Sequence, residues 1–168
     1  MEAVLTLILY HIPEACFFTL SGLGLVGLKV PAKRWLPLVL AFGIIVQVMR
    51  RVFFPWHIPL LAIIQAVVQK YYFRISWLTS IGAVFVSLIL VNIGEAVLAL
   101  IVFPLLSLSA ERVFNDPVLY VVMGWVTQIP LAVATLGAYQ RGWVIIPLHS
   151  GDGGAGVEHG SGRQGKVS

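Results

Sequence analysis

The sequence predicts an all-α protein, a polytopic bundle of about five transmembrane helices. Two observations carry this prediction. The composition is 59% hydrophobic and only 11% charged, with a mean hydropathy of +0.95, and the apolar residues form long segments separated by short polar ones. Such a chain of 168 residues has more apolar surface than one soluble domain can bury. We therefore expect an integral, multi-pass protein of the cell membrane.

A basic segment separates the first two predicted helices. A hydrocarbon core of about 30 Å needs about 20 apolar residues per helix, and residues 3–28 supply them before the segment KVPAKR. Because Glu2 opens the chain and no basic region precedes the apolar residues, we interpret this segment as a retained helix and not as a signal peptide. A short second helix over residues 35–49 ends at Arg50 and Arg51.

Two prolines predict a turn after the second helix. They lie in VFFPWHIP, residues 52–59, and proline lacks an N–H group and fixes φ. A re-entrant segment at this corner is an alternative, so six membrane segments stay open beside five. Helix three is predicted over residues 57–69, and the following KYYFR is typical of an interfacial belt.

The longest apolar segment predicts helix four over residues 77–106. A polar loop over residues 107–117 separates it from helix five, residues 118–139. Residues 1–147 would then form the transmembrane helical bundle. The Gly-rich residues 148–168 have almost no apolar content to bury, which predicts a disordered tail.

The distribution of positive charge predicts the orientation. With five helices, eight of the 11 Lys and Arg residues fall on the side of the first loop and the C-terminal tail, and three fall on the other side. Positive residues are retained on the cytoplasmic side. The N-terminus is therefore expected outside and the C-terminus, with its tail, in the cytoplasm. This topology also explains the pI near 9.5, so we expect the lipid bilayer and no nucleic acid as a partner.

Polar side chains from three predicted helices lie at similar depth. At about 1.5 Å per residue, they are roughly 12 to 21 Å below the outer surface. Carboxylates persist in a membrane when they face the bundle interior, take a proton or meet a partner. Arg50 and Arg51 are candidate counter-charges, and Pro13 leaves the carbonyl of Leu9 without its helical donor. We expect an outward-facing polar cavity lined by His11, Glu14, Asn92, Glu95 and Gln128.

Two other readings of these polar residues remain open. Interhelical hydrogen bonds often join membrane helices without any ligand, and buried carboxylates also line proton or ion paths. A structural role would need no cavity, whereas a sensor or a transport subunit would.

No motif in the sequence predicts an enzyme. Cys16 and His11 are about 140° apart on a helix, and the pattern His11-x-x-Glu14 supplies two ligands, too few for a zinc site. The sequence contains no phosphate-binding loop, serine elbow or paired-carboxylate motif. We expect no catalytic residues, no metal and no cofactor.

Short motifs resemble a known group of membrane proteins. They are IPEA at residues 12–15, a basic first loop, RRVFFPWH at residues 50–57 and NIGEA at residues 92–96. Together they resemble small five- to six-helix Firmicutes membrane proteins, which are similar to the membrane sensor region of quorum-sensing-type histidine kinases. The resemblance implies detection of an extracellular or membrane-dissolved signal. This chain lacks the phospho-accepting helix and the ATP-binding domain of such kinases, so a separate partner would carry the output.

The sequence thus predicts a non-enzymatic sensor or ligand-binding membrane module. It would bind a small molecule or a peptide and act with a membrane or cytoplasmic protein partner. A substrate-binding subunit of a modular membrane transporter is one alternative, since it has a similar size and helix count. A structural or assembly subunit is another.

Overall fold

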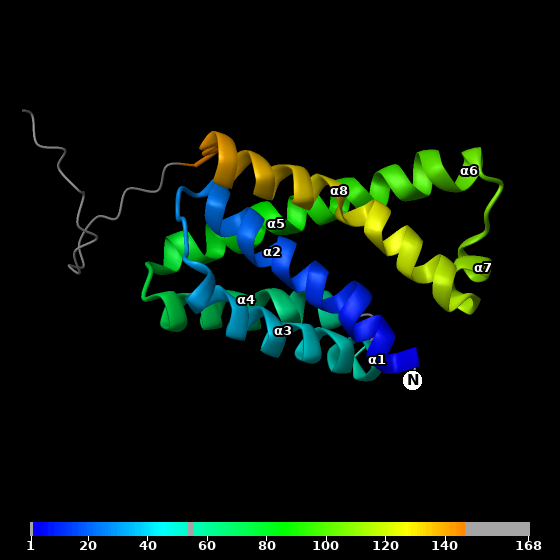
Figure 1. The fold of residues 1–168 in the computed structure, drawn as a ribbon, viewed down its shortest axis with the longest axis horizontal. Helices are drawn as coiled ribbons and strands as arrows, with labels where there is room; N and C mark the ends of the chain where they lie inside the picture. Colours follow the sequence, from blue (N-terminus) through cyan, green and yellow to red (C-terminus); the bar gives the residue numbers. More distant parts are fainter. Residues whose placement is uncertain (1, 54–55, 147–168) are drawn as a thin grey trace, which may run out of the picture.

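The computed structural model describes residues 2–53 and 56–146, and every element within them is helical. The predicted tail, residues 148–168, lies outside the described residues. Figure 1 shows an elongated bundle in which successive long helices alternate in direction along one long axis. The first rod of this bundle consists of α1 (Glu2–Thr6), the π-helical turn η1 (Leu7–His11) and α2 (Ile12–Leu25).

The other elements follow in chain order. Helix α5 continues through the π-helical turn η2 into the short helix α6, and these three elements form a second rod. The chain then reverses through α7 at the end of the bundle where it began, and α8 returns along the axis (Figure 1). Their bounds are α3 (Ala32–Val52), α4 (His57–Phe73), α5 (Trp77–Val97), η2 (Leu98–Val102), α6 (Phe103–Leu105), α7 (Ala110–Asn115) and α8 (Pro117–Arg141).

Four helical segments are long and apolar enough to cross a membrane. They are Val4–Leu25, Ala32–Arg50, Trp77–Leu105 and Pro117–Arg141. Helix α4, predicted as a further span, has 17 residues and a length of about 25 Å. It nevertheless runs beside α3 and α5 in the bundle. The membrane class is therefore supported, while a fifth span stays a prediction.

Several predicted bounds differ from the structure. The first predicted helix ends at Leu25 and not at residue 28, and α4 continues beyond residue 69 to Phe73. Helix α3 begins at Ala32 and extends to Val52, beyond the predicted residues 35–49. The prediction ended this helix at charged residues, because charge limits how much of a helix enters lipid. The long aliphatic parts of these side chains are nevertheless compatible with a helical backbone. The loop predicted over residues 107–117 also contains a helix, α7, which starts where the Ser109 side chain accepts a hydrogen bond from the Arg112 amide at 3.2 Å.

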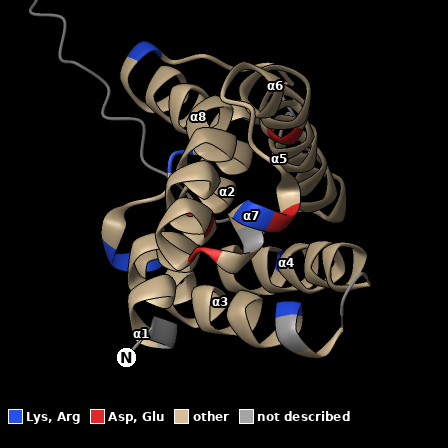
Figure 2. Cartoon of the chain, turned by 90° about the vertical axis from the view of Figure 1, so that its right-hand side faces the viewer, with Lys and Arg blue, Asp and Glu red and all other residues tan. Residues whose placement is uncertain are grey.

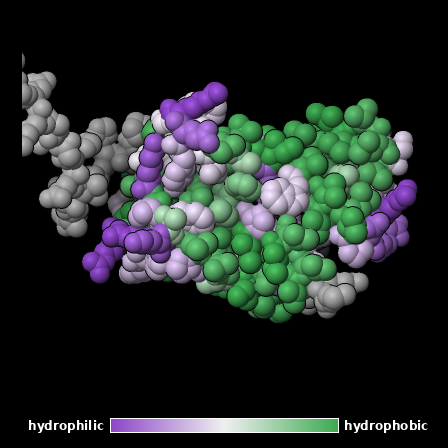
Figure 3. Space-filling model, viewed as in Figure 1, coloured by the Kyte–Doolittle hydropathy of each residue, from purple (hydrophilic) through white to green (hydrophobic). Residues whose placement is uncertain are grey.

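Large apolar side chains cover much of the outside of the bundle. Ile63 and Phe85 are each 62% exposed, and Leu100 is 77% exposed. Figure 3 shows this apolar surface between hydrophilic residues that gather toward both ends of the long axis. Such a surface is costly in water and is compatible with a hydrocarbon environment.

Helices α2 and α5 lie at the centre of the bundle and are joined by small polar residues. Helix α2 contacts α3, α5 and α8, and α5 contacts α2, α4 and α8. The hydroxyls of Ser21 and Ser87 are 3.2 Å apart, and the Ser87 hydroxyl donates to the Phe18 carbonyl at 2.6 Å. A side chain at Gly22 would collide with the Ala83 carbonyl. Without a hydrophobic driving force between helices in lipid, such close contacts and hydrogen bonds hold the bundle.

Polar side chains also attach α4 to the centre. The Gln65 amide donates to the Thr19 hydroxyl at 2.8 Å, and the Ser80 hydroxyl donates to the Ala66 carbonyl at 2.5 Å. Gln65, Thr19 and Ser80 are completely buried. Helix α4 is therefore part of the packed bundle despite its shorter length.

The closest approach of α5 to α8 gives a stability test. A Cβ atom at Gly94 would overlap the backbone carbonyl of Thr127, which cannot rotate away. At Gly43 a Cβ atom would lie 3.0 Å from Cγ1 and 3.3 Å from Cα of Ile12, a milder contact that a shift of a few tenths of an ångström would relieve. We expect Gly94→Ala to lower the free energy of unfolding by about 1–3 kcal/mol, the usual cost of overpacking. Gly43→Ala serves as the comparison and should lower the melting temperature in detergent clearly less than Gly94→Ala does. Equal melting temperatures for the two variants would contradict the close approach.

Candidate functional site

A cavity of about 760 Å³ lies between the helices at the end of the bundle where the chain begins. Residues of α2, α3, α4, α5, α7 and α8 line it. Helix α7 covers this end, as the end-on view shows (Figure 2), and turns Ala110 and Val113 to the cavity. Most of the wall is apolar and includes Phe18, Phe42, Val46, Leu61, Leu88 and Met123.

An ion pair forms one side of the cavity. Nη2 of Arg50, in the last turns of α3, donates to Oε1 of Glu14 on α2 at 2.5 Å. The Arg50 side chain is 26% exposed and that of Glu14 is 14% exposed. Two charges of this kind are stable inside an apolar bundle only when each compensates the other.

Two tyrosines complete the surroundings of Arg50. Its Nη1 donates to the hydroxyls of Tyr10 and Tyr120, each at 3.1 Å, and its Cζ lies 5.2 Å from the centre of the Tyr10 ring. The two tyrosine rings meet edge to face with centroids 5.3 Å apart. Because Gly124 has no side chain, the Tyr10 ring fits directly against α8. One guanidinium thus joins α2, α3 and α8.

Glu14 is held from its own helix as well. Nδ1 of His11 lies 3.4 Å from Oε2 of Glu14, and His11 is only 4% exposed. The three-residue spacing puts both side chains on one face of the helix. Both carboxylate oxygens of Glu14 therefore have partners, Arg50 on one side and His11 on the other.

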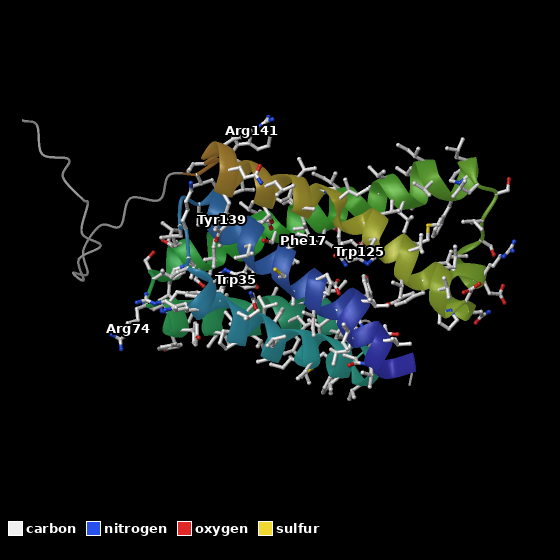
Figure 4. The ribbon with its side chains drawn as sticks, viewed as in Figure 1. Phe17, Trp35, Arg74, Trp125, Tyr139 and Arg141 are labelled. Carbon is white, nitrogen blue, oxygen red and sulfur yellow. The ribbon has the colours of Figure 1, made fainter. Side chains whose placement is uncertain are left out.

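The π-helical turn η1 prepares this arrangement. Pro13 has no N–H to donate to the Leu9 carbonyl and its ring crowds that carbonyl, and η1 widens the helix just before it. The free carbonyl of Leu9 accepts a hydrogen bond from the indole Nε1 of Trp125 at 2.9 Å. Trp125 and Phe17 lie side by side on α8 and α2 (Figure 4), with ring centroids 6.2 Å apart. The hydrogen bond from Trp125 to the Leu9 carbonyl, which Pro13 leaves without its helical donor, therefore connects α8 to the first rod.

Helix α5 supplies further polar residues to the lining of the cavity. Asn92 and Glu95 are both exposed, and both line the cavity. The Asn92 amide nitrogen donates to the Leu88 carbonyl of its own helix at 2.7 Å. Glu95 makes no hydrogen bond or ion pair with any residue in the described ranges. It is thus a carboxylate that faces the cavity without a direct partner.

The predicted site residues are only partly brought together. Glu14, Asn92, Glu95 and Arg50 line one cavity. His11 stays behind Glu14 and Gln128 is buried in α8, so neither of them lines it. The amide of Gln128 makes no hydrogen bond within residues 2–53 and 56–146. The side chain of Arg51 lies outside the described residues.

Four polar lining residues were not predicted. They are Tyr10, His57, Tyr120 and Thr127, and His57 is 7% exposed. Helical spacing could have identified the tyrosines. Tyr10 is one turn before Glu14 and Tyr120 is one turn before Gly124, so each lies on the same helix face as a residue of the cavity. His57 follows the proline corner, where the direction of the chain could not be read from the sequence.

The chemistry available at this site is binding by charge and shape. No group of three metal-ligating side chains occurs in the part of the chain that the structure describes. Cys16 is half-buried and packs against the apolar cluster of Ala15, Val39, Phe42 and Val46. Comparisons with protein families, characterised proteins and solved structures give no match to this chain.

The ion pair gives a prediction for a double-mutant cycle. Arg50→Leu leaves the Glu14 carboxylate uncompensated inside the bundle, and we expect it to lower the free energy of unfolding by about 3–5 kcal/mol. Combining it with Glu14→Gln should recover part of this loss, because no unpaired charge remains. Unfolding in detergent measures each variant, and Arg112→Leu on the exposed part of α7 is the matched control. Strictly additive effects of the two substitutions would exclude an energetic coupling between these side chains.

Proposed function

We propose that this chain is a multi-pass protein of the cell membrane that binds a small ligand inside its helical bundle. The observation that carries the proposal is the cavity of about 760 Å³, mostly apolar and with charged side chains of α2, α3 and α5 in its lining. Ligand sites usually have volumes of about 300–1,000 Å³ and combine apolar walls with a few polar groups. The bound state would be read by a separate partner protein, as in a sensor module.

The charges support an orientation with the cavity toward the outside. Six basic residues lie toward the end of the bundle away from the cavity: Lys29, Lys33, Arg34, Lys70, Arg74 and Arg141. At the cavity end Arg50 is turned inward to Glu14, and Arg112 is exposed on α7. Because positive residues are retained in the cytoplasm, the N-terminus and the cavity would face outward and the C-terminus inward. Helix α4 would then cross the membrane as a fifth span.

The alternatives differ in what they require of the cavity. A structural subunit could use the Arg50 network to join helices, but it would have no need for Glu95 facing an open space. A substrate-binding subunit of a transporter would use the same ligand cavity and would differ in its partner. The cavity favours the two ligand-binding readings over the structural one, and the resemblance to kinase sensor regions favours the sensor.

The orientation can be tested with a pair of serines. Ser109 and Ser76 are both exposed N-cap residues, of α7 and α5, at opposite ends of the bundle. In a background with Cys16→Ala, we expect a membrane-impermeant maleimide to label Ser109→Cys in intact cells. Ser76→Cys should react only after the membrane is permeabilised. Labelling in the reverse order would overturn the proposed orientation.

Ligand binding can be tested by filling the cavity. Ala62 of α4 lines it, whereas Ala96 of α5 is exposed and does not. We expect native mass spectrometry of the protein, gently extracted from its membrane, to detect a co-purified small molecule. Ala62→Trp should lose this molecule because the ring occupies its space, and Ala96→Trp should retain it. A protein partner without any small molecule, or equal retention by both variants, would favour a structural subunit.

A further inference from the structure

We infer that the ligand of this cavity is an amphipathic amine whose ammonium group binds to Glu95 and Asn92 on α5. This inference rests on the proposed function and names the class of ligand. It follows from which polar groups around the cavity already have partners and which do not.

The positive charge of the cavity is already neutralised. Arg50 directs Nη2 to Glu14 and Nη1 to two tyrosine hydroxyls. Its remaining nitrogen, Nε, is buried and makes no hydrogen bond within the described ranges, so a ligand in the cavity does not reach it. An anionic ligand would have to displace Glu14 and leave that carboxylate uncompensated, which is costly. The arrangement of Arg50 therefore disfavours a carboxylate or phosphate ligand.

The negative charge of Glu95 has no such compensation. Glu14 is engaged by Arg50 and His11, whereas Glu95 makes no hydrogen bond or ion pair in the described part of the chain. With His57 in its neutral form, the charged groups lining the cavity leave one net negative charge. A bound cation would neutralise this net negative charge.

Asn92 adds an acceptor beside Glu95. The two residues are three apart on α5, so they share one face of the helix. The Asn92 amide nitrogen uses one of its two hydrogens in a bond to the Leu88 carbonyl at 2.7 Å, and the amide oxygen accepts no hydrogen bond within the described residues, so it is available to a ligand. An ammonium group has three donors and no acceptor. It therefore matches a wall that offers a carboxylate and an amide oxygen.

The rest of the ligand is expected to be apolar. Phe18, Leu61, Leu88 and Val91 are among the apolar residues that line the same cavity as Glu95 and Asn92. In a membrane, however, lipid tails solvate an alkyl chain about as well as these side chains do. Selection between amphiphiles of one chain length must then come from the polar end. This is why a charge match at Glu95 would decide which molecule binds.

Octylamine, octanol and octanoate test this inference, because they share one alkyl chain and differ in charge. Binding of each is measured by equilibrium dialysis of the full chain in phosphatidylcholine nanodiscs near pH 7, with empty nanodiscs subtracted. We expect octylamine to bind about tenfold more tightly than the other two, as a charge-assisted hydrogen bond implies. Glu95→Gln should remove this preference while octanol binding stays unchanged, which also shows that the variant is folded. Glu111→Gln, on the exposed part of α7, should leave the preference intact.

The outcomes separate this inference from the proposed function. If octanol or octanoate binds as tightly as octylamine and Ala62→Trp abolishes the binding, the cavity is a ligand site but not one for amines. Retention of the amine preference in Glu95→Gln would likewise overturn the assignment to Glu95. If none of the three probes binds above empty nanodiscs, both the inference and the proposed function fail.

Discussion

The ion pair between Glu14 and Arg50 is the interaction on which this end of the molecule depends. Each charge is tolerable in an apolar bundle only because the other lies 2.5 Å away. The pair fixes the last turns of α3 against α2, and the tyrosines that bind the same guanidinium bring α8 to the same point. This compact cluster pairs Arg50 with Glu14, while Glu95 lines the same cavity without a hydrogen bond or ion pair in the described residues.

The cavity results from close contact in one place and divergence in another. Helices α5 and α8 touch at Gly94 and Thr127, where no side chain separates their backbones. Beyond this contact they separate toward α6 and α7 (Figure 1). Gly22 and the serines hold α2 against α5 on the other side of the bundle. Tight packing by small residues therefore sets the helix directions, and the space between the diverging ends becomes the cavity that α7 covers.

Much of this could be predicted residue by residue. A buried carboxylate at Glu14 requires a cation, and Arg50 at the end of the neighbouring helix was the natural candidate. Pro13 necessarily released the Leu9 carbonyl, although nothing in the sequence identified Trp125 as its donor. Gln128 was predicted to line the cavity, but it is buried in α8 and does not line it. Depth follows from position along a helix, whereas the direction of a side chain depends on the rotation of that helix, which packing decides.

The sequence by itself determined that the chain is helical and has apolar segments long enough to span a membrane, where most of these segments lie, and that ionisable groups occur within them. Those properties follow from composition, segment length and the cost of charge in hydrocarbon, all of which are local. Only the tertiary structure decided that Arg50 binds Tyr10 and Tyr120 as well as Glu14, that a helix covers the end of the bundle, and that Glu95 faces a cavity. These outcomes depend on crossing angles and rotations set by contacts between residues far apart in the chain.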